Sequence, residues 1–358
     1  MSTPATQTAL AKKLGLSRST VAAALNPNSP VRLREATIKL VREEAARLNY
    51  RPNQYAQIMR RGRSGIVGIF HFGGLSQVAA QRAWHASQAI QSGGYKVLST
   101  EVSWSPGGAK AGCEAMLDAQ VEGIIVAGLN DPESEQELAA LQKSGIPIVT
   151  LSGNELPGAP HVRGDASDAM YRMTQHLIGL GRRKLLLLAS FSGSYNWAGA
   201  ERLKGFESAI GTPLVDHFPR TRPSQPIGRV IKSDFPEQRF DPFHAAKAAM
   251  HQLLATSPLP DAVLCGNDDW AVGALAACRE AGIAVPGQLA ITGYDNTATG
   301  AYLDVPLTTI SQPSEAMALK AVDLLMKLMS GQKLSASSRL IKLPCELVVR
   351  QSCGSPAR

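Results

Sequence analysis

The chain has 358 residues, of which 44% are hydrophobic and 18% charged, and this length suffices for two or three domains with sizeable cores. Its five cysteines are scattered without a CxxC pair, and no stretch approaches the roughly 18 apolar residues that a membrane helix needs. These features argue against a zinc site, a disulfide framework and a membrane span. The N-terminus lacks the segments of a secretory signal, so we expect a chain that works in the cytoplasm.

The formal net charge of +8 is unevenly distributed. Residues 1–63 contain twelve Lys and Arg but only three Glu, so this segment carries +9 and the remainder carries −1. An excess of this size indicates a polyanionic partner, with nucleic acid as the leading candidate. A basic face that serves only solubility is the alternative.

The first predicted elements are two short helices joined by a tight turn, within residues 7–26. Ala11 is the fifth residue of this window, Gly15 the ninth and Val21 the fifteenth. A helix-turn-helix needs this arrangement, because a small residue lets the helices approach, a glycine makes the turn and a branched apolar residue fixes the second helix. Ser17 is placed to cap that second helix.

The start of the second helix would expose Arg18, Ser19 and Thr20, which are side chains that read base edges or grip phosphates. A third helix is predicted over roughly residues 37–48, where apolar residues recur at helical spacing. Glycine and serine also precede ordinary helices, so this pattern alone leaves a plain three-helix domain open. The spacing, the third helix and the charge of +9 together favour a DNA-binding head.

From Gly65 onward, short apolar runs alternate with amphipathic helical segments such as residues 166–180 and 268–281. The apolar runs lie near residues 66–71, 95–98, 123–126, 146–151, 184–189, 262–265 and 288–292. This alternation predicts parallel sheets covered by helices. About 290 residues of this pattern suit two α/β lobes, with a ligand site at the carboxyl ends of the strands.

No motif in the chain indicates an enzyme. No GxGxxG opens a helix after a strand, no phosphate-loop lysine is present, and none of the seven histidines belongs to an HExxH motif. Ser190 and Ser192 do not lie in a GxSxG turn. We therefore expect no catalysis, no metal and no cofactor.

The segment after the third helix reads LNYRPNQYAQIMRRGR, and together with STVAAALN it resembles the lac repressor family of bacterial transcription regulators. The resemblance covers essentially the whole chain. It implies a three-helix helix-turn-helix head in residues 1–50, a hinge helix in 51–63 and an effector-binding and dimerisation domain in 64–358.

That last domain is expected to have the two-lobed, periplasmic-binding-protein-like α/β fold with parallel sheets. By analogy with the family, the chain crosses between the lobes three times. One lobe is then expected over roughly residues 64–160 with 292–325, and the other over 161–291 with the C-terminal tail.

In this family the hinge helix folds on DNA, enters the minor groove as a pair and wedges a leucine between base pairs. Met59 matches that leucine and is apolar and unbranched, so it can act as the wedge, and Arg60 beside it could grip the groove. A basic linker is the alternative interpretation. The full DNA-binding set that we predict is Ser17, Arg18, Ser19, Thr20, Asn26, Tyr50, Asn53, Met59 and Arg60.

Two features of the head depart from the family. The usual VSRALN is VAAALN here, so Ala23 replaces an arginine that often reads a base. The loop PNSPVRLRE also looks about two residues longer than is common. The operator sequence therefore cannot be transferred from a relative.

Three charged residues, Asp165, Arg202 and Asp295, follow predicted strands, where each could serve only as a helix cap, an ion pair or a turn residue. The resemblance implies more. The arginine of RLKGF anchors the effector in relatives, the aspartate of TGYDN accepts hydrogen bonds from it, and GNDD and KSDF supply an amide and an aromatic ring. Such groups would hold a small polyhydroxylated or heterocyclic ligand. The full effector-binding set that we predict is Asp165, Asn196, Trp197, Arg202, Phe235, Asn267 and Asp295.

The opposite side of the predicted pocket departs from the family. Gly73 stands where an aspartate is usual, and Ser152 replaces a common sugar-binding aspartate. The effector, sugar-like or nucleoside-like, need not be a common hexose.

The resulting interpretation is a repressor that binds a two-fold symmetric operator as a homodimer and responds to a small-molecule effector, with no membrane partner. Two helix-turn-helix heads that read two half-sites require two-fold symmetry. The alternative is a two-lobed sensor or solute-binding protein without specific DNA binding, and the basic head argues against it.

Overall fold

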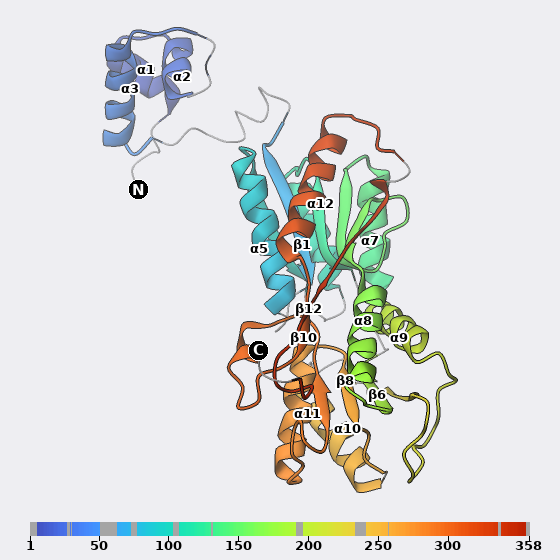
Figure 1. Ribbon diagram of the computed structural model, residues 1–358. Helices are drawn as coiled ribbons and strands as arrows, with labels where there is room; N and C mark the ends of the chain where they lie inside the picture. Colours follow the sequence, from blue (N-terminus) through green and yellow to red (C-terminus); the bar gives the residue numbers. More distant parts are fainter. Residues whose placement is uncertain are drawn as a thin grey trace. The chain divides into compact units, whose positions relative to one another are not determined.

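The computed structural model divides the chain into two compact units, Met1–Ser64 and Gly65–Arg358, which we call the head and the body (Figure 1). The residues that the structure describes are 6–26, 29, 31–50, 63–72, 77–102, 107–129, 132–190, 196–232, 241–256, 258–335 and 338–355. Among these residues, no helix has the length and apolar character needed to cross a membrane.

The head contains three helices, which are α1 (Gln7–Leu14), α2 (Arg18–Leu25) and α3 (Glu35–Arg47). Its core is formed by Leu10, Ala11, Val21, Ala24, Val41 and Ala45. Gly15 ends α1 in the left-handed conformation, with φ of 63°, and its N–H bonds to the carbonyls of Ala11 and Lys12. The predicted helix-turn-helix with its glycine turn is thus confirmed.

The body begins with a six-stranded parallel sheet, whose spatial order is β11-β5-β4-β3-β1-β2. Its strands are β1 (Ile66–Phe72), β2 (Lys96–Val102), β3 (Ile124–Leu129), β4 (Ile148–Gly153), β5 (His161–Gly164) and β11 (Leu340–Leu343). Helices cover both faces, as the near-continuous apolar strands require. One face packs against α5 (Gln77–Ser92) and α12 (Ser314–Met329), and the other against α6 (Gly108–Asp118) and α7 (Pro132–Lys143).

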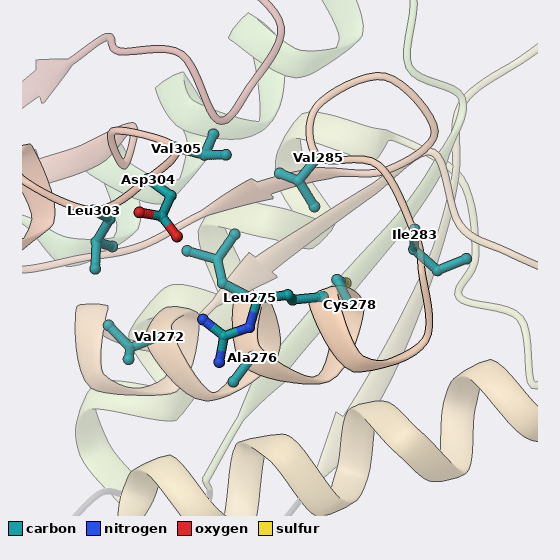
Figure 2. Close-up of a pocket in the computed structure, with 10 residues that line it drawn as sticks. Val272, Leu275, Ala276, Cys278, Ile283, Val285, Leu303, Asp304 and Val305 are labelled. Atoms are coloured by element: carbon teal, nitrogen blue, oxygen red, sulfur yellow. The ribbon is translucent and has the colours of Figure 1, made fainter.

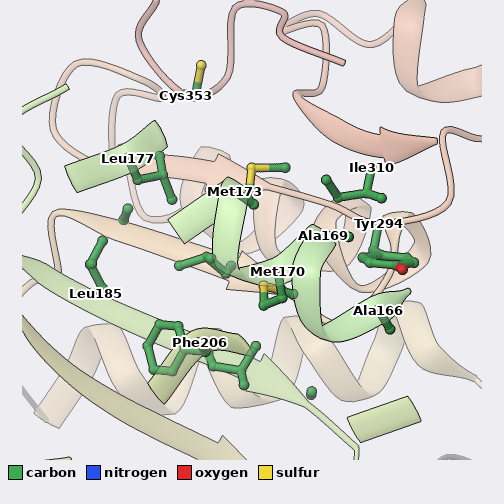
Figure 3. Close-up of a cluster of buried hydrophobic side chains, with 14 of the residues drawn as sticks. Ala166, Ala169, Met170, Met173, Leu177, Leu185, Phe206, Tyr294, Ile310 and Cys353 are labelled. Carbon is green, nitrogen blue, oxygen red and sulfur yellow. The ribbon is translucent and has the colours of Figure 1, made fainter. Parts of the chain in front are cut away.

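The second lobe has a four-stranded parallel sheet in the order β7-β6-β8-β9. Its strands are β6 (Lys184–Ala189), β7 (Ile227–Lys232), β8 (Ala262–Cys265) and β9 (Ala290–Thr292). Alternate leucines of β6 face opposite sides of the sheet. One side packs on α8 (Ala166–Gly179) and α9 (Asn196–Ile210), as Figure 3 shows, and the other on α10 (Pro242–Thr256) and α11 (Asp268–Glu280).

The lobe boundaries differ from the expected ones at two places. His161–Gly164 and Leu340–Leu343 pair with each other in the first sheet, whereas both had been assigned to the second lobe. Both strands are short, and β11 at the edge of the sheet alternates between exposed and half-buried residues, so neither appears as an apolar run. A small antiparallel pair, β10 (Thr309–Ser311) with β12 (Glu346–Val348), lies where the chain passes between the lobes.

Candidate functional site

The start of α2 forms an exposed polar face on the head. Ser17 caps the helix, because its hydroxyl oxygen accepts from the backbone N–H of Thr20 at 3.0 Å, which confirms the predicted cap. The Ser17 oxygen also lies 2.7 Å from the Ser19 hydroxyl and 2.8 Å from the Thr20 hydroxyl. The three hydroxyl groups therefore form one cluster beside Arg18.

The cations of the head fall into two groups. Lys13 and Arg47 both form ion pairs with Glu44. These contacts lower the pKa of Glu44 to about 2, and the hydrogen bond with Arg47 is the largest cause. Arg18 is exposed, and its guanidinium makes no hydrogen bond or ion pair with any residue that the structure describes. A cation left unpaired at a helix start is available to an anionic partner.

The remaining predicted DNA-binding residues have different positions. Asn26 follows α2 as its C-cap, and Tyr50 packs partly buried against the core of the head. Asn53, Met59 and Arg60 lie outside the described residues.

In the body, a chain of hydrogen bonds joins an arginine of the first lobe to the segment after β9. Arg82 of α5 donates from Nη2 to Gln312 Oε1 at 2.7 Å, and Gln312 Nε2 donates to Asp295 Oδ1 at 2.5 Å. Only this amide orientation satisfies both neighbours, because guanidinium only donates and carboxylate only accepts. Gln312 therefore stands between the arginine and the aspartate.

Arg202 of α9 approaches the same place from the second lobe. Its guanidinium carbon lies 4.1 Å from the ring centre of Tyr294, a distance typical of a cation–π contact. Only 8% of Arg82 and 9% of Arg202 is exposed, and the Nε atom of each is buried without a hydrogen-bond partner among the described residues. We call Arg82, Arg202, Tyr294, Asp295 and Gln312 the interlobe cluster.

The backbone at Asp295 is strained. Asp295 has φ of +115° and Asn296 has φ of +52°, and both are conformations that side-chain-bearing residues rarely adopt. The strain is held by the Asp295 N–H, which donates to Ile310 O at 2.8 Å, and by Arg350, which donates to the Asn296 side-chain oxygen at 2.7 Å. Strain maintained in this way is typical of functional sites.

Burial and nearby charges act in opposite directions on Asp295. Burial raises its pKa, whereas Arg202, Arg82 and the hydrogen bond from Gln312 act to lower it. Unlike the two arginines, Asp295 keeps partial exposure. Its carboxylate is therefore the acidic acceptor of the interlobe cluster.

Asn267 and Asp268 serve the local structure. The Asn267 side-chain oxygen caps α11 by accepting from the N–H of Trp270 at 3.0 Å. Asp268 is 1% exposed and accepts from the Thr297 N–H at 2.6 Å and from the Thr309 hydroxyl at 2.6 Å. Burial, the largest cause, raises the pKa of Asp268 to about 7. Asp268 thus braces the segment that carries Asp295.

The other predicted effector residues are not brought into the interlobe cluster by any contact that the structure describes. Asp165 caps α8 and lines a separate depression with Tyr171, Lys204 and Lys342. Asn196 and Trp197 are the first two residues of α9, but their side chains are not among those that the structure describes. Phe235 lies outside the described residues.

Sequence reasoning missed Arg82 and Gln312. Arg82 lies on a helix that shows only its amphipathic pattern, and Gln312 follows a strand of three residues. The hydrogen bond between them joins positions 230 residues apart, so no local pattern could have identified it. A lone arginine at a core-facing helix position is the one available signal, because arginine is rarely buried without a partner.

A second feature of the body is an apolar hollow of about 350 Å³ over α11 (Figure 2). Val272 and Leu275 line it from the helix, and Leu303 and Val305 line it from the loop that follows β9. The neighbouring Tyr302 is 89% exposed. Among the described residues, no group of three or more His, Cys, Asp or Glu side chains could hold a metal.

The chain is similar to known proteins over nearly its whole length. The family of periplasmic binding protein-like domains matches residues 174–353. The HTH-type transcriptional repressor PurR of Photobacterium profundum is 26% identical over 347 residues, which cover 96% of this chain and 97% of that protein. An uncharacterized HTH-type transcriptional regulator in the aml 5' region of Streptomyces limosus is 31% identical over 305 residues, covering 82% of this chain and 80% of that protein.

The fold is also similar to that of solved structures. The crystal structure of the lac repressor dimer bound to operator and the anti-inducer ONPF superposes with a TM-score of 0.79 and 25% identity, over 98% of this chain and 99% of that chain. This similarity covers both the head and the body.

Proposed function

The chain belongs to the lac repressor family of bacterial transcription regulators, and we propose that it represses transcription by binding a two-fold symmetric operator under the control of a small effector. The observation that carries this proposal is the helix-turn-helix head, in which exposed Arg18 stands unpaired among the described residues beside a capped helix start. The relatives are repressors and regulators, so the chain is a regulator rather than an enzyme. Because such a protein acts on chromosomal DNA, we place it in the cytoplasm.

The effector is assigned to the interlobe cluster. Arg202 supplies donors from α9 of the second lobe, and Asp295 supplies an acceptor from the segment after β9. Gln312 joins Asp295 to Arg82 of the first lobe. A ligand that binds one arrangement of the lobes more tightly than another shifts the equilibrium between them, which is how effector binding would alter DNA affinity.

Two copies of the chain are needed to read two half-sites, and the apolar hollow over α11 is the surface that we assign to the second copy. Exposed apolar surface of this kind marks protein contacts, and Tyr302 and Leu303 would be buried by it. Leu303→Asp should convert the dimer to a monomer in sedimentation experiments. Leu117→Asp, which changes an exposed leucine on α6, is the matched control and should leave the dimer intact.

Selection of the full chain against random double-stranded DNA tests the DNA-binding function. We expect enrichment of a site with two inverted half-sites, and an affinity that falls steeply as salt rises, because lysine and arginine contacts to phosphate release counterions. Failure to enrich any sequence, together with no salt-sensitive DNA affinity, would support a solute-binding protein instead.

A further inference from the structure

We propose that the effector carries a single carboxylate group and that Arg82 is the residue that selects for this group. The inference rests on the proposed function, because it concerns the effector site at the interlobe cluster. It adds the chemical class of the ligand and a specificity residue from the first lobe.

The interlobe cluster is unbalanced in charge. It contains two guanidinium groups, Arg82 and Arg202, and one carboxylate, Asp295. Asp268 and Asp269 both interact electrostatically with Asp295, but neither makes an ion pair with these arginines among the described residues. Asp268 instead accepts from Thr297 and Thr309, and burial raises its pKa to about 7. Arg163, also buried, is neutralised separately by Glu155 and Glu201. The cluster therefore has an excess of one positive charge.

Gln312 separates Arg82 from Asp295. The guanidinium donates to the amide oxygen at 2.7 Å, and the amide nitrogen donates to the carboxylate at 2.5 Å. Arg82 thus reaches a neutral acceptor rather than a carboxylate. A buried cation is costly unless it is paired and hydrogen-bonded, and this pairing is incomplete.

The two arginines also have unused donors. The Nε atoms of Arg82 and Arg202 are buried without hydrogen-bond partners among the described residues, and the contact of Arg202 with the Tyr294 ring is not a hydrogen bond. A guanidinium fork matches the two oxygens of a carboxylate. One carboxylate would satisfy such donors and neutralise the excess charge together.

The same balance distinguishes a carboxylate from a phosphate monoester. A phosphate monoester carries about −1.5 to −2 charges near pH 7, so its binding would leave excess negative charge beside Asp295. A carboxylate carries one charge and leaves the cluster neutral. The remainder of the ligand would donate hydrogen bonds to Asp295, as hydroxyl or amino groups do.

The test uses the full chain and a series of related neutral, carboxylate and phosphate compounds. These are D-glucose, D-gluconate, D-glucuronate and glucose 6-phosphate, with the corresponding galactose and ribose series. Thermal unfolding screens binding, since a ligand of the folded state raises the unfolding temperature, and calorimetric titration then gives Kd. The variants are Arg82→Gln, Arg82→Lys and, as a control for surface charge, Arg220→Gln.

We expect at least one acid to bind the wild type and its neutral parent to bind about tenfold or more weakly. Arg82→Gln should lose this preference, whereas Arg82→Lys, which keeps the charge, should retain part of it. Arg220→Gln should match the wild type.

The inference is overturned if no acid binds, if a neutral sugar or a phosphate binds more tightly than the acid, or if Arg82→Gln folds and keeps the preference. A neutral sugar whose binding is lost in Arg202→Ala would overturn the inference while supporting the proposed function. Absence of DNA binding by the wild type would instead count against the proposed function itself.

Discussion

Arg18 in the head and Arg202 in the body both lie on helices, yet their surroundings are opposite. Arg18 is exposed and unpaired among the described residues, whereas Arg202 is 9% exposed and lies over the Tyr294 ring. Water solvates the first cation at no cost, so only the cap at Ser17 is needed to orient its helix. The second loses water and needs aromatic and acidic neighbours, which come from distant parts of the chain.

This contrast has a consequence for substitutions. In the body, functional side chains are held by the same contacts that hold the fold, so changes there should reduce folding stability as well as function. In the head, the DNA-contacting side chains that we propose contribute little to folding. Changes there should reduce DNA binding and leave stability nearly unchanged.

Gly205→Ala should give the largest effect on stability. An added Cβ would lie against the backbone oxygen of Ser167, well inside van der Waals contact, because α9 packs directly on the backbone of α8. We expect a loss of about 3 kcal/mol in the free energy of unfolding, measured by chemical denaturation. Arg202 lies one turn away on α9, so effector binding should weaken as well.

Gly179→Ala is the matched control on α8. Nothing lies within 4 Å of the added Cβ, and the residue is helical, so stability should be unchanged or should rise by about 0.5–1 kcal/mol. Equal stability losses in the two variants would show that close approach of the helices is not the reason for Gly205.

Asp268→Asn should change the pH dependence of stability. Burial raises the pKa of Asp268 from 3.8 to about 7, so the folded chain holds a proton that the unfolded chain releases above about pH 4. Wild-type stability should therefore fall as pH rises from about 4 to about 7 and then level off. The asparagine variant should reduce this fall by on the order of 2 kcal/mol, measured by denaturation at each pH.

The head should respond in the opposite direction. The pKa of Glu44 is lowered from 4.5 to about 2, and its hydrogen bond with Arg47 is the largest cause. The stability that Glu44 gives to the folded head is therefore fully present above about pH 4.5 and is lost as the pH falls below that value. Asp216→Asn, an exposed change in the body, serves as a control for Asp268→Asn. Parallel stability curves for the wild type and Asp268→Asn from pH 4 to 7 would show that Asp268 is ionised throughout.

Arg18→Ala should cost about 2 kcal/mol of operator affinity and relax one base position in each half-site, because its fork matches the edge of guanine. Its thermal unfolding should match that of the wild type, since the guanidinium makes no hydrogen bond or ion pair with a described residue. Titration of the selected operator and of its single-base variants provides the measurement. A uniform loss on all sequences would make Arg18 a phosphate contact.

Ser17→Ala is the substitution in the head that should reduce both folding stability and DNA binding. It removes the hydroxyl oxygen that accepts from the Thr20 N–H at 3.0 Å. We expect the free energy of unfolding of the head to fall by about 1 kcal/mol. Because α2 carries Arg18, operator affinity should fall as well. Ser17→Asn keeps an acceptor at the cap and should restore stability, so identical unfolding of the Ala and Asn variants would contradict the role of the cap.

The sequence predicted well the elements whose signals are local. Gly15 and Ser17 marked the turn and the helix start of the head, and the apolar run at residues 184–189 coincides with β6. The strands β5 and β11 were missed because they are short and do not form apolar runs. Local pattern therefore identified the strands that form apolar runs and missed those that do not.

The interlobe cluster was predictable only in part. Arg202 and Asp295 lie in short motifs that resemble the family, so the sequence could name them, although their role stays a prediction. Arg82 and Gln312 join them through contacts between positions far apart in the chain, and burial of an arginine is decided by those contacts. Asn267 and Asp165 lie in motifs of the same kind, yet the structure uses both as helix caps.

The most direct test of the central claim is the operator affinity of the wild type and of Arg202→Ala, each measured with and without the tightest-binding compound of the sugar and sugar-acid series. We expect the compound to change the operator affinity of the wild type by about tenfold or more and that of Arg202→Ala by no more than about twofold. Without the compound, the two proteins should bind the operator equally. An equal response of both proteins, or none in the wild type, would contradict an effector-controlled regulator that acts through the interlobe cluster.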